Sequence, residues 1–202
     1  MSEPLRLEPA THLRLFSDMH LDMHVQKRFK KEQLWYPDPL PEDKDSILLL
    51  AGDIWHAKKP FYFSGFSWMK EVASRFKYVF VVLGNHDFWD GQLPNEYENF
   101  KRYAKEQELN NVYLLQNNEI LMGDYKFLGA TFWVNYANNP EFMEKAQEYS
   151  DYRFIRYINP IYRGVFKRLK PKNVVEAHNR DRNYIFENAK KDYPEQKVWV
   201  FT

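Results

Sequence analysis

Three short apolar runs, each followed by polar residues, mark the first half of this 202-residue chain. They cover 13–16, 47–51 and 78–83. Each run is too short for a buried helix, and the third is rich in β-branched and aromatic residues, which favours strands of a buried parallel sheet. The polar residues that follow the runs should therefore lie at the carboxyl ends of neighbouring strands, where open α/β sheets bind their ligands.

The rest of the chain predicts helices and a second group of strands. Apolar residues recur at helical spacing in 65–76, as expected for a helix that covers the first sheet. Further helices are expected over 95–108 and 174–191. The later strands are expected at 112–115, 119–122, 126–133 and 197–202. Gly123 and Asp124 favour a hairpin turn, so a second sheet should begin in this region.

The polar residues after the three runs are of metal-binding types. Asp18 and His20 follow the first run, Asp53 the second, and Asn85 and His86 the third. The steps from Asp18 to Asp53 and from Asp53 to Asn85 are 35 and 32 residues, close to the roughly 30 of a strand-helix-strand crossover. These side chains should therefore gather at one rim. Taken alone, Asp18 and His20 could equally be a turn aspartate and a surface histidine, and Asp53 a capping residue.

These motifs, in this order and spacing, resemble the calcineurin-like metallophosphoesterase family. The motifs are Asp18-x-His20, Gly52-Asp53 and Gly84-Asn85-His86-Asp87, and the segment Gly129 to Trp133 is also similar to one found in the family. The resemblance covers nearly the whole chain. It implies an α/β fold, a metallophosphoesterase-like αββα sandwich of two mixed sheets flanked by helices, formed as a single domain over 1–202.

The resemblance also implies a role for each motif residue. The implied metal ligands are Asp18, His20, Asp53 and Asn85, with Asp53 bridging two divalent ions. The implied catalytic residues are His86, which assists the leaving oxygen or stabilises the phosphoryl transition state, and Asp87, which holds His86 in orientation. The implied cofactors are two divalent metal ions, of which Mn²⁺ is the first expectation and Fe, Zn²⁺, Ni²⁺ and Mg²⁺ are the other candidates.

The implied function is hydrolysis of a phosphomonoester or phosphodiester by a metal-activated water. In the family, a strand similar to 198–202 is followed by a histidine and later by a Gly-His-x-His pair, and neither occurs here. We therefore expect a C-terminally truncated chain with the last strands missing, and an open sheet edge that invites a homodimer. The alternative is a natural short form that borrows ligands from a partner or works with one tightly bound metal. The alternative function is that of an impaired fragment, or of a binding or regulatory protein that keeps the phosphoesterase fold.

Several other residues are expected to serve packing or the surface. His24 is expected at the surface, and His56 is expected to pack beside the pocket. Family members often carry a histidine in a helix comparable to that of His178, but the resemblance assigns it no role here, so His178 is a doubtful site residue. Thr131 and Trp133 in the 126–133 strand, and Asn135 just after it, are also expected to pack.

The amino-acid composition limits the kinds of partner that the protein is expected to bind. Lys and Arg total 29 and Asp and Glu 28, so a net charge of +1 gives no global field for nucleic acid or membrane. The absence of cysteine excludes thiolate metal sites and suits a reducing cytosol, so we expect a cytoplasmic protein. No apolar run is long enough to span a membrane. The expected partner is a phosphoester substrate, with a nucleotide or nucleic acid among the candidates.

Two basic segments bear on that choice of substrate. Between 153 and 182, nine basic residues face two acidic ones, and aromatic residues are interleaved with them. This segment could guide a polyanion toward the metals. Its aromatic residues could stack on bases, but aromatic anchoring of an irregular cap onto the core explains them better. The cluster at 27–31 is expected to be a solvated surface.

Overall fold

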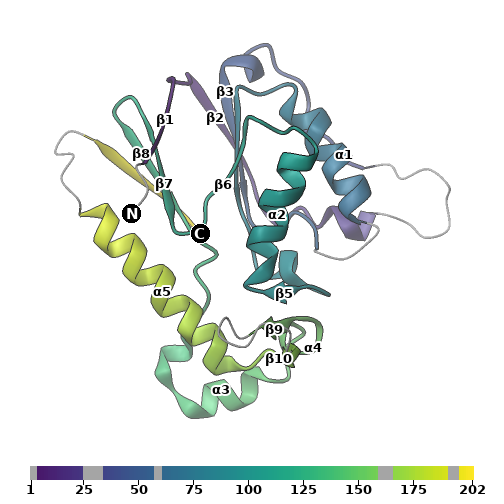
Figure 1. Cartoon of the computed structure of the whole chain (residues 1–202), viewed down its shortest axis with the longest axis vertical. Coiled ribbons are helices and arrows are strands. Elements are labelled where there is room, and N and C mark those ends of the chain that lie inside the picture. The colour runs from purple at the N-terminus through teal and green to yellow at the C-terminus, as the bar shows by residue number, and fades with distance from the viewer. Residues whose placement is uncertain (1–3, 25–33, 57–60, 159–165, 191–195) are drawn as a thin grey trace.

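The computed structural model describes residues 4–24, 34–56, 61–158, 166–190 and 196–202. Two four-stranded sheets pack against each other and helices flank them (Figure 1), which confirms the expected α/β sandwich. The first sheet has the order β2-β3-β4-β6 and is parallel in all three pairings. Its strands are β2 (His12–Phe16), β3 (Ser46–Ala51), β4 (Tyr78–Val82) and β6 (Val112–Leu114).

The second sheet is mixed and has the order β1-β7-β8-β11. Its strands are β1 (Leu5–Leu7), β7 (Asn118–Met122), β8 (Tyr125–Gly129) and β11 (Lys197–Phe201). β7 and β8 form the expected hairpin, and β11 runs parallel to β8 at the edge. The exposed side chains of Val198, Trp199 and Val200 lie on this edge strand. Dimerisation through it stays a prediction.

Alternation along the central strands explains the layering. In β3, Ile47 and Leu49 belong to the core between the two sheets, whereas Leu48 and Leu50 belong to the core under the helices. A strand that buries both faces must be apolar at every position, which is why its sequence shows no polar alternation. The helices that cover the first sheet are α1 (Phe61–Ala73) and α2 (Asn95–Glu106) (Figure 1).

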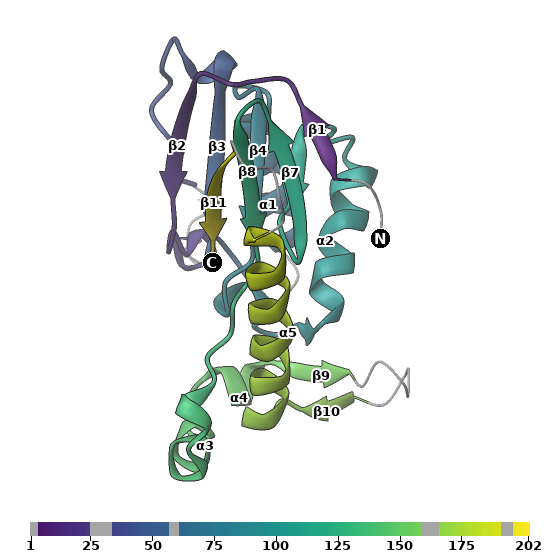
Figure 2. The same ribbon diagram turned by 90° about the vertical axis from the view of Figure 1, so that its left-hand side faces the viewer.

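A smaller lobe lies beyond one end of the sandwich (Figure 2). This cap lobe comprises η4 (Tyr136–Asn138), α3 (Pro140–Ala146), α4 (Asp151–Phe154), β9 (Arg156–Ile158) and β10 (Phe166–Arg168). β9 pairs with β10 and with β5 (Gln92–Leu93), so the lobe is tied to the chain that follows β4. The long helix α5 (Pro171–Ala189) runs from the lobe to the second sheet, where its Asn188 carbonyl accepts a hydrogen bond from Lys126.

One expected strand is shorter than the sequence suggested. The prediction of a strand over 126–133 was wrong at its end, because β8 stops at Gly129. The chain then turns, and Phe132 has a φ of 51°, which is incompatible with an extended strand. The short strands β1, β5, β9 and β10 and the helices α3 and α4 were not predicted. No helix in the described ranges is long and apolar enough to cross a membrane.

Candidate metal centre

The loops after β2, β3 and β4 meet at the carboxyl ends of the first sheet. Their backbones are joined by hydrogen bonds: Asp18 N–H donates to the Gly52 carbonyl (3.0 Å), and His20 N–H donates to the Asp53 carbonyl (2.9 Å). Gly52 N–H in turn donates to the Val82 carbonyl at the end of β4 (3.0 Å). The three expected motifs are therefore held side by side by the same parallel register that orders the strands.

The backbone in these loops carries strain at the residues expected to bind metal. Asp18, His20 and Asp53 have φ values of 52°, 42° and 54°, in the left-handed region that side chains with a Cβ disfavour. Such conformations cost free energy and persist where the surroundings impose them, often at functional sites. Here the interloop hydrogen bonds impose them.

This arrangement brings three donor groups together. The nearest donor atoms of Asp18, His20 and Asp53 all lie within 4.8 Å of one another. Two carboxylate oxygens and one imidazole nitrogen at this separation suit a divalent first-row cation. The donor chemistry therefore fits the metal that the sequence implied, and the three residues come from two different loops.

Gly84 makes room for the Asp53 side chain. A Cβ on Gly84 would lie 2.1 Å from Asp53 Oδ1, closer than any real contact. Asp53 also accepts a hydrogen bond from the His86 N–H (2.9 Å). Burial raises the pKa of Asp53, although the His86 hydrogen bond and nearby imidazoles oppose that rise.

Asn85 lies on the same pocket wall as Asp18 and Asp53. Its amide nitrogen donates to Asp151 Oδ1 on α4 (3.0 Å), which also accepts the Trp89 indole N–H (2.8 Å). Asn85 is exposed, so its position depends on this contact with the cap lobe rather than on burial. Asp53 and Asn85 are the described residues expected to serve a second metal.

His86 is buried and faces a carboxylate that the sequence reading had not assigned. Its Nε2 lies 3.2 and 3.1 Å from the two oxygens of Asp22, which belongs to η1 (Leu21–His24). Burial would lower the pKa of His86, but the hydrogen bond and charge of Asp22 outweigh it and raise the pKa. Burial would raise the pKa of Asp22, and His86 with His56 outweighs it and lowers that pKa.

Asp87 contacts the backbone of the neighbouring loops. Its carboxylate accepts backbone hydrogen bonds from Asp53 (2.9 Å), Trp55 (2.8 Å) and Gly84 (2.8 Å). Asp22 is the carboxylate that faces Nε2 of His86, so the expected role of Asp87 in orienting that ring stays a prediction. Burial raises the pKa of Asp87 to about 7, with the backbone hydrogen bonds opposing that rise. Asp87 thus fixes the two loops that carry the candidate ligands.

The pocket above these loops has a volume of about 360 Å³. Both sheets and the cap lobe contribute to its wall: Asp18, Asp53, Gly84 and Asn85 from the first sheet, Thr131, Phe132, Trp133, Val134 and Thr202 from the second, and Asp151 from α4. Thr131 and Trp133 were expected to pack only. They pack and also line the pocket, because the turn after β8 carries them over its mouth.

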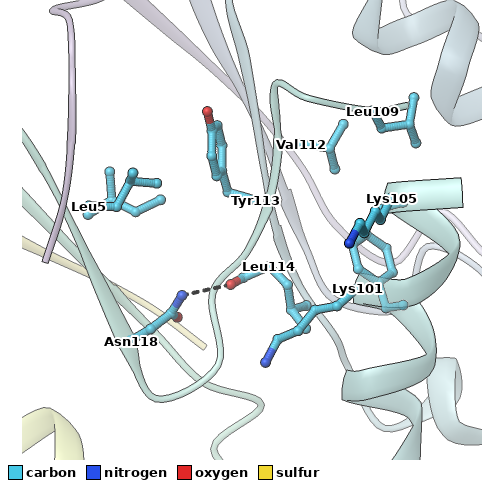
Figure 3. A pocket seen from close by; sticks show the side chains of 11 residues that line it. Leu5, Lys101, Lys105, Leu109, Val112, Tyr113, Leu114 and Asn118 are labelled. Atoms are coloured by element: carbon cyan, nitrogen blue, oxygen red, sulfur yellow. Dashed lines mark hydrogen bonds between the residues drawn. The ribbon is translucent and has the colours of Figure 1, made fainter. Parts of the chain in front are cut away.

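A second cavity of about 280 Å³ lies elsewhere, between α2 and the strands β1, β6 and β7 (Figure 3). Its wall is mainly apolar, with Lys101 and Lys105 from α2 at its side and an Asn118 amide that donates to the Leu114 carbonyl (3.0 Å). None of the expected site residues lines it.

The remaining histidines occupy different positions. His178 on α5 is buried, and its ring contacts the Trp133 carbonyl and the Phe132 ring. It therefore supports the pocket turn from behind. His56 Nε2 lies 3.6 Å from Asp22 Oδ2, beside the His86 ring. His24 ends η1.

The other expectations concern the cap and the basic segments. The Asn135 side chain accepts a hydrogen bond from the Ala137 N–H and caps η4. Arg153, Arg156, Lys167 and Arg168 are exposed on the cap lobe. Arg163 and the cluster at 27–31 lie outside the described residues.

Asp22 and Asp151 are the site residues that the sequence reading missed. Asp22 extends the first motif to Asp18-x-His20-x-Asp22, so its spacing offered a signal that went unused. Asp151 offered none, because it lies 66 residues from its partner Asn85 and outside every motif.

The chain is similar in sequence to a known protein family and to a viral protein. The model of the calcineurin-like phosphoesterase family matches residues 12–196. An uncharacterized protein of Acanthamoeba polyphaga mimivirus is 27% identical over 152 residues, which cover 73% of this chain and 52% of that protein. The chain therefore spans about half the length of this relative.

A solved structure has a similar fold. The phosphopantetheinyl hydrolase PptH of Mycobacterium tuberculosis superposes with a TM-score of 0.57 at 16% identity, over 94% of this chain and 67% of the other. At that identity the likeness concerns the fold alone. Because the family match includes all three loops that gather at the rim of the first sheet, the chain belongs to the calcineurin-like phosphoesterase family.

Proposed function

We propose that this protein is a metal-dependent phosphoesterase that hydrolyses a phosphomonoester or phosphodiester in the pocket above β2, β3 and β4. Family membership supports this activity at its general level. The observation that carries the proposal is the approach of the Asp18, His20 and Asp53 donor atoms to within 4.8 Å of one another on the pocket side of the sheet.

Asp18, His20 and Asp53 would hold one divalent ion, and Asp53 with Asn85 would contribute to a second. When bound, such ions polarise a phosphoryl oxygen and lower the pKa of water toward neutrality. The strained, hydrogen-bonded loops fix these side chains in advance, which avoids reorganisation during the reaction. Asp87 keeps the loops in register through its three backbone contacts.

His86 would act on the leaving group. The Asp22 carboxylate fixes its ring at 3.1 and 3.2 Å and favours the protonated form, so the imidazole can hold the proton that a leaving oxygen needs. The indole of Trp89 lies 4.3 Å from the His86 ring, between centroids, and shields it from water. Asp22 is thus a positioning residue for His86.

The proposal extends to the metal, the class of substrate and the cellular location. Mn²⁺ is the first metal to try, since two carboxylates and one imidazole accept it readily. A nucleotide or a nucleic acid is a candidate substrate, because the exposed Arg153, Arg156 and Arg168 lie on the cap lobe that borders the pocket. The cysteine-free composition supports a cytoplasmic location.

The test is Mn²⁺-dependent hydrolysis of an aryl phosphomonoester and an aryl phosphodiester by the purified chain. Asp53→Asn should lower kcat/KM by about 10²-fold or more, because a ligand of the reacting centre is lost. Asp124→Asn, in the exposed hairpin turn, is the matched control and should keep full activity. Equal rates for the wild type and Asp53→Asn would refute the proposal and favour a binding or regulatory protein.

A further inference from the structure

Three imidazole rings converge on the carboxylate of Asp22. Nε2 of His86 lies 3.1 Å and Nε2 of His56 lies 3.6 Å from the same oxygen, Oδ2. The His20 ring meets the His86 ring edge to face, with centroids 4.4 Å apart. The four side chains come from the loops after three different strands, so the parallel register of the first sheet assembles them as it assembles the candidate catalytic ligands.

The spacing of these donors suits a tetrahedral ion. Donor atoms bound at about 2.0–2.1 Å from a tetrahedral metal lie roughly 3.3 Å from one another. The separations of 3.1 and 3.6 Å around Asp22 lie on either side of that value. In addition, one donor atom from each of His20, Asp22 and His86 falls within a 4.8 Å span. These three side chains are close enough to share one cation, whereas His56 approaches Asp22 and would have to turn toward the other two to complete the set.

The environment of the cluster also favours a cation. The side chains of Asp22, His86 and His56 are 9%, 6% and 22% exposed, so the field of the carboxylate is weakly screened. His20 Nδ1 is buried and has no hydrogen-bond partner among the described residues. A buried ring nitrogen without a partner is unfavourable, and coordination to a metal would satisfy it.

This cluster differs in chemistry from the candidate catalytic group. Asp18, His20 and Asp53 offer two carboxylates and one imidazole, whereas the Asp22 cluster offers one carboxylate and three imidazoles. Nitrogen-rich tetrahedral sets favour Zn²⁺, and oxygen-rich sets favour Mn²⁺ and Mg²⁺. The two groups share only His20.

We propose that His20, Asp22, His56 and His86 form an additional transition-metal site that binds Zn²⁺ and inhibits the enzyme when occupied. A metal ion there would take His86 Nε2 from the Asp22 carboxylate, so it would remove the contact that positions the His86 ring for the leaving group, and it would compete for His20. The binding site stands on the geometry alone. The inhibition rests on the proposed phosphoesterase function.

The binding test uses Co²⁺ as a visible probe in the 202-residue chain. An Asp18→Asn/Asp53→Asn double variant removes both carboxylates of the catalytic group and keeps all four proposed ligands. Titration of this variant should give the intense d–d absorption of tetrahedral Co²⁺ at one equivalent, and Zn²⁺ should displace it. Adding Asp22→Asn should weaken Co²⁺ binding at least about 10-fold.

Two outcomes would overturn the site. One is the absence of tetrahedral absorption from the double variant, and the other is unchanged Co²⁺ affinity after Asp22→Asn. If Asp22→Asn unfolds, as circular dichroism would reveal, His56→Gln replaces it. Loss of this partly buried ligand should also weaken Co²⁺ binding, and unchanged affinity would again refute the proposal.

The inhibition test adds Zn²⁺ to the Mn²⁺-loaded wild type and to His56→Gln. The rate of each protein without Zn²⁺ is its own reference, and the variant should need about 10-fold more Zn²⁺ than the wild type to halve that rate. An identical Zn²⁺ response in both proteins would refute the inhibition. If neither protein hydrolyses a phosphoester, the proposed function fails, while the Co²⁺ titration still decides the site.

Discussion

The carboxylate of Asp151 accepts a hydrogen bond of 3.0 Å from the amide nitrogen of Asn85. With its nitrogen engaged by the cap lobe, the Asn85 amide turns its oxygen the other way, and oxygen is the atom that a metal requires. The Trp89 indole donates to the same Asp151 oxygen at 2.8 Å, which holds the carboxylate in place. Asp151 of the cap lobe thus determines the orientation of the Asn85 amide, a candidate metal ligand.

Asp151→Ala should lower kcat by about 10- to 100-fold, because Asn85 would lose the contact that orients it. Asp151→Asn keeps an acceptor oxygen for the Asn85 amide and should restore most of the activity. The measurement is steady-state kinetics with Mn²⁺ on the aryl phosphoesters, together with the Mn²⁺ concentration needed for half-maximal rate. Wild-type kinetics for Asp151→Ala would show that Asn85 needs no such orientation.

Gly84→Ala should abolish activity and reduce stability. The new Cβ would lie 2.1 Å from Asp53 Oδ1 and 2.6 Å from the Asp53 nitrogen, so the aspartate loop must move. Thermal unfolding and hydrolysis rates measure the two effects.

Gly123→Ala is the matched control for that change. Gly123 has a φ of 54°, so alanine there is strained, but among the described residues a Cβ added there would meet only Pro9 Cγ, at an ordinary contact distance of 3.6 Å. It should cost about 1 kcal/mol of stability and leave the rate unchanged. If the two glycine variants behaved alike, the contact between Gly84 and Asp53 would not be what limits activity.

Asp87→Asn should destabilise the protein and disturb the site together. An amide presents one oxygen and one NH₂ group, so the NH₂ would face a backbone N–H of Asp53, Trp55 or Gly84. An unsatisfied buried group of this kind costs about 1–3 kcal/mol. Urea unfolding should show that loss, and Mn²⁺ affinity should fall with it. A fully stable Asp87→Asn protein would contradict the structural role assigned to this carboxylate.

Asp43 should make stability depend on acid pH. It accepts hydrogen bonds from Arg14 (2.6 Å) and Arg75 (3.0 Å) and from the Leu40 N–H (3.1 Å). Burial would raise its pKa, but these contacts outweigh burial and lower the pKa below 3.8. The unfolded chain therefore takes up the proton first, so this stabilisation is complete well above pH 3.8 and is lost as the pH falls through the folded pKa.

Asp43→Asn should cost about 2 kcal/mol at neutral pH, the typical contribution of hydrogen bonds to charged groups. The cost should shrink on acidification below the unfolded pKa of 3.8. The measurement is urea unfolding at neutral pH and at a pH below 3.8. It compares the wild type with Asp43→Asn and with the exposed control Asp45→Asn. A cost that does not change with pH would show that the arginine contacts add nothing through charge.

The part of the fold that the sequence predicted is the part built on continuous burial. β3 and β4 are apolar at every position because both faces are buried, and their parallel pairing places the following loops at one rim. The grouping of Asp18, His20 and Asp53 follows from that register alone. The turn at Gly123 was predictable on a different ground, because glycine followed by aspartate is a residue pair typical of hairpin turns.

The cap lobe was not predictable, because tertiary contacts determine it. Its strands β9 and β10 are three residues each, and β9 is ordered by pairing with β5, more than 60 residues earlier. The spacing of Asp22 from Asp18 and His20 marks it as a candidate site residue, but its partner His86 lies 64 positions away and only the turn of η1 brings the two together. A local pattern can thus indicate the residue but not its partner.

The left-handed backbone at Asp18, His20 and Asp53 restricts what could ever replace them. Asparagine and aspartate tolerate this conformation far better than β-branched residues, since a short polar side chain can bond to its own backbone. Valine, isoleucine and threonine are therefore excluded on backbone grounds before any ligand chemistry is considered. An engineer who seeks a different metal preference here can exchange carboxylate for amide or imidazole, and little else.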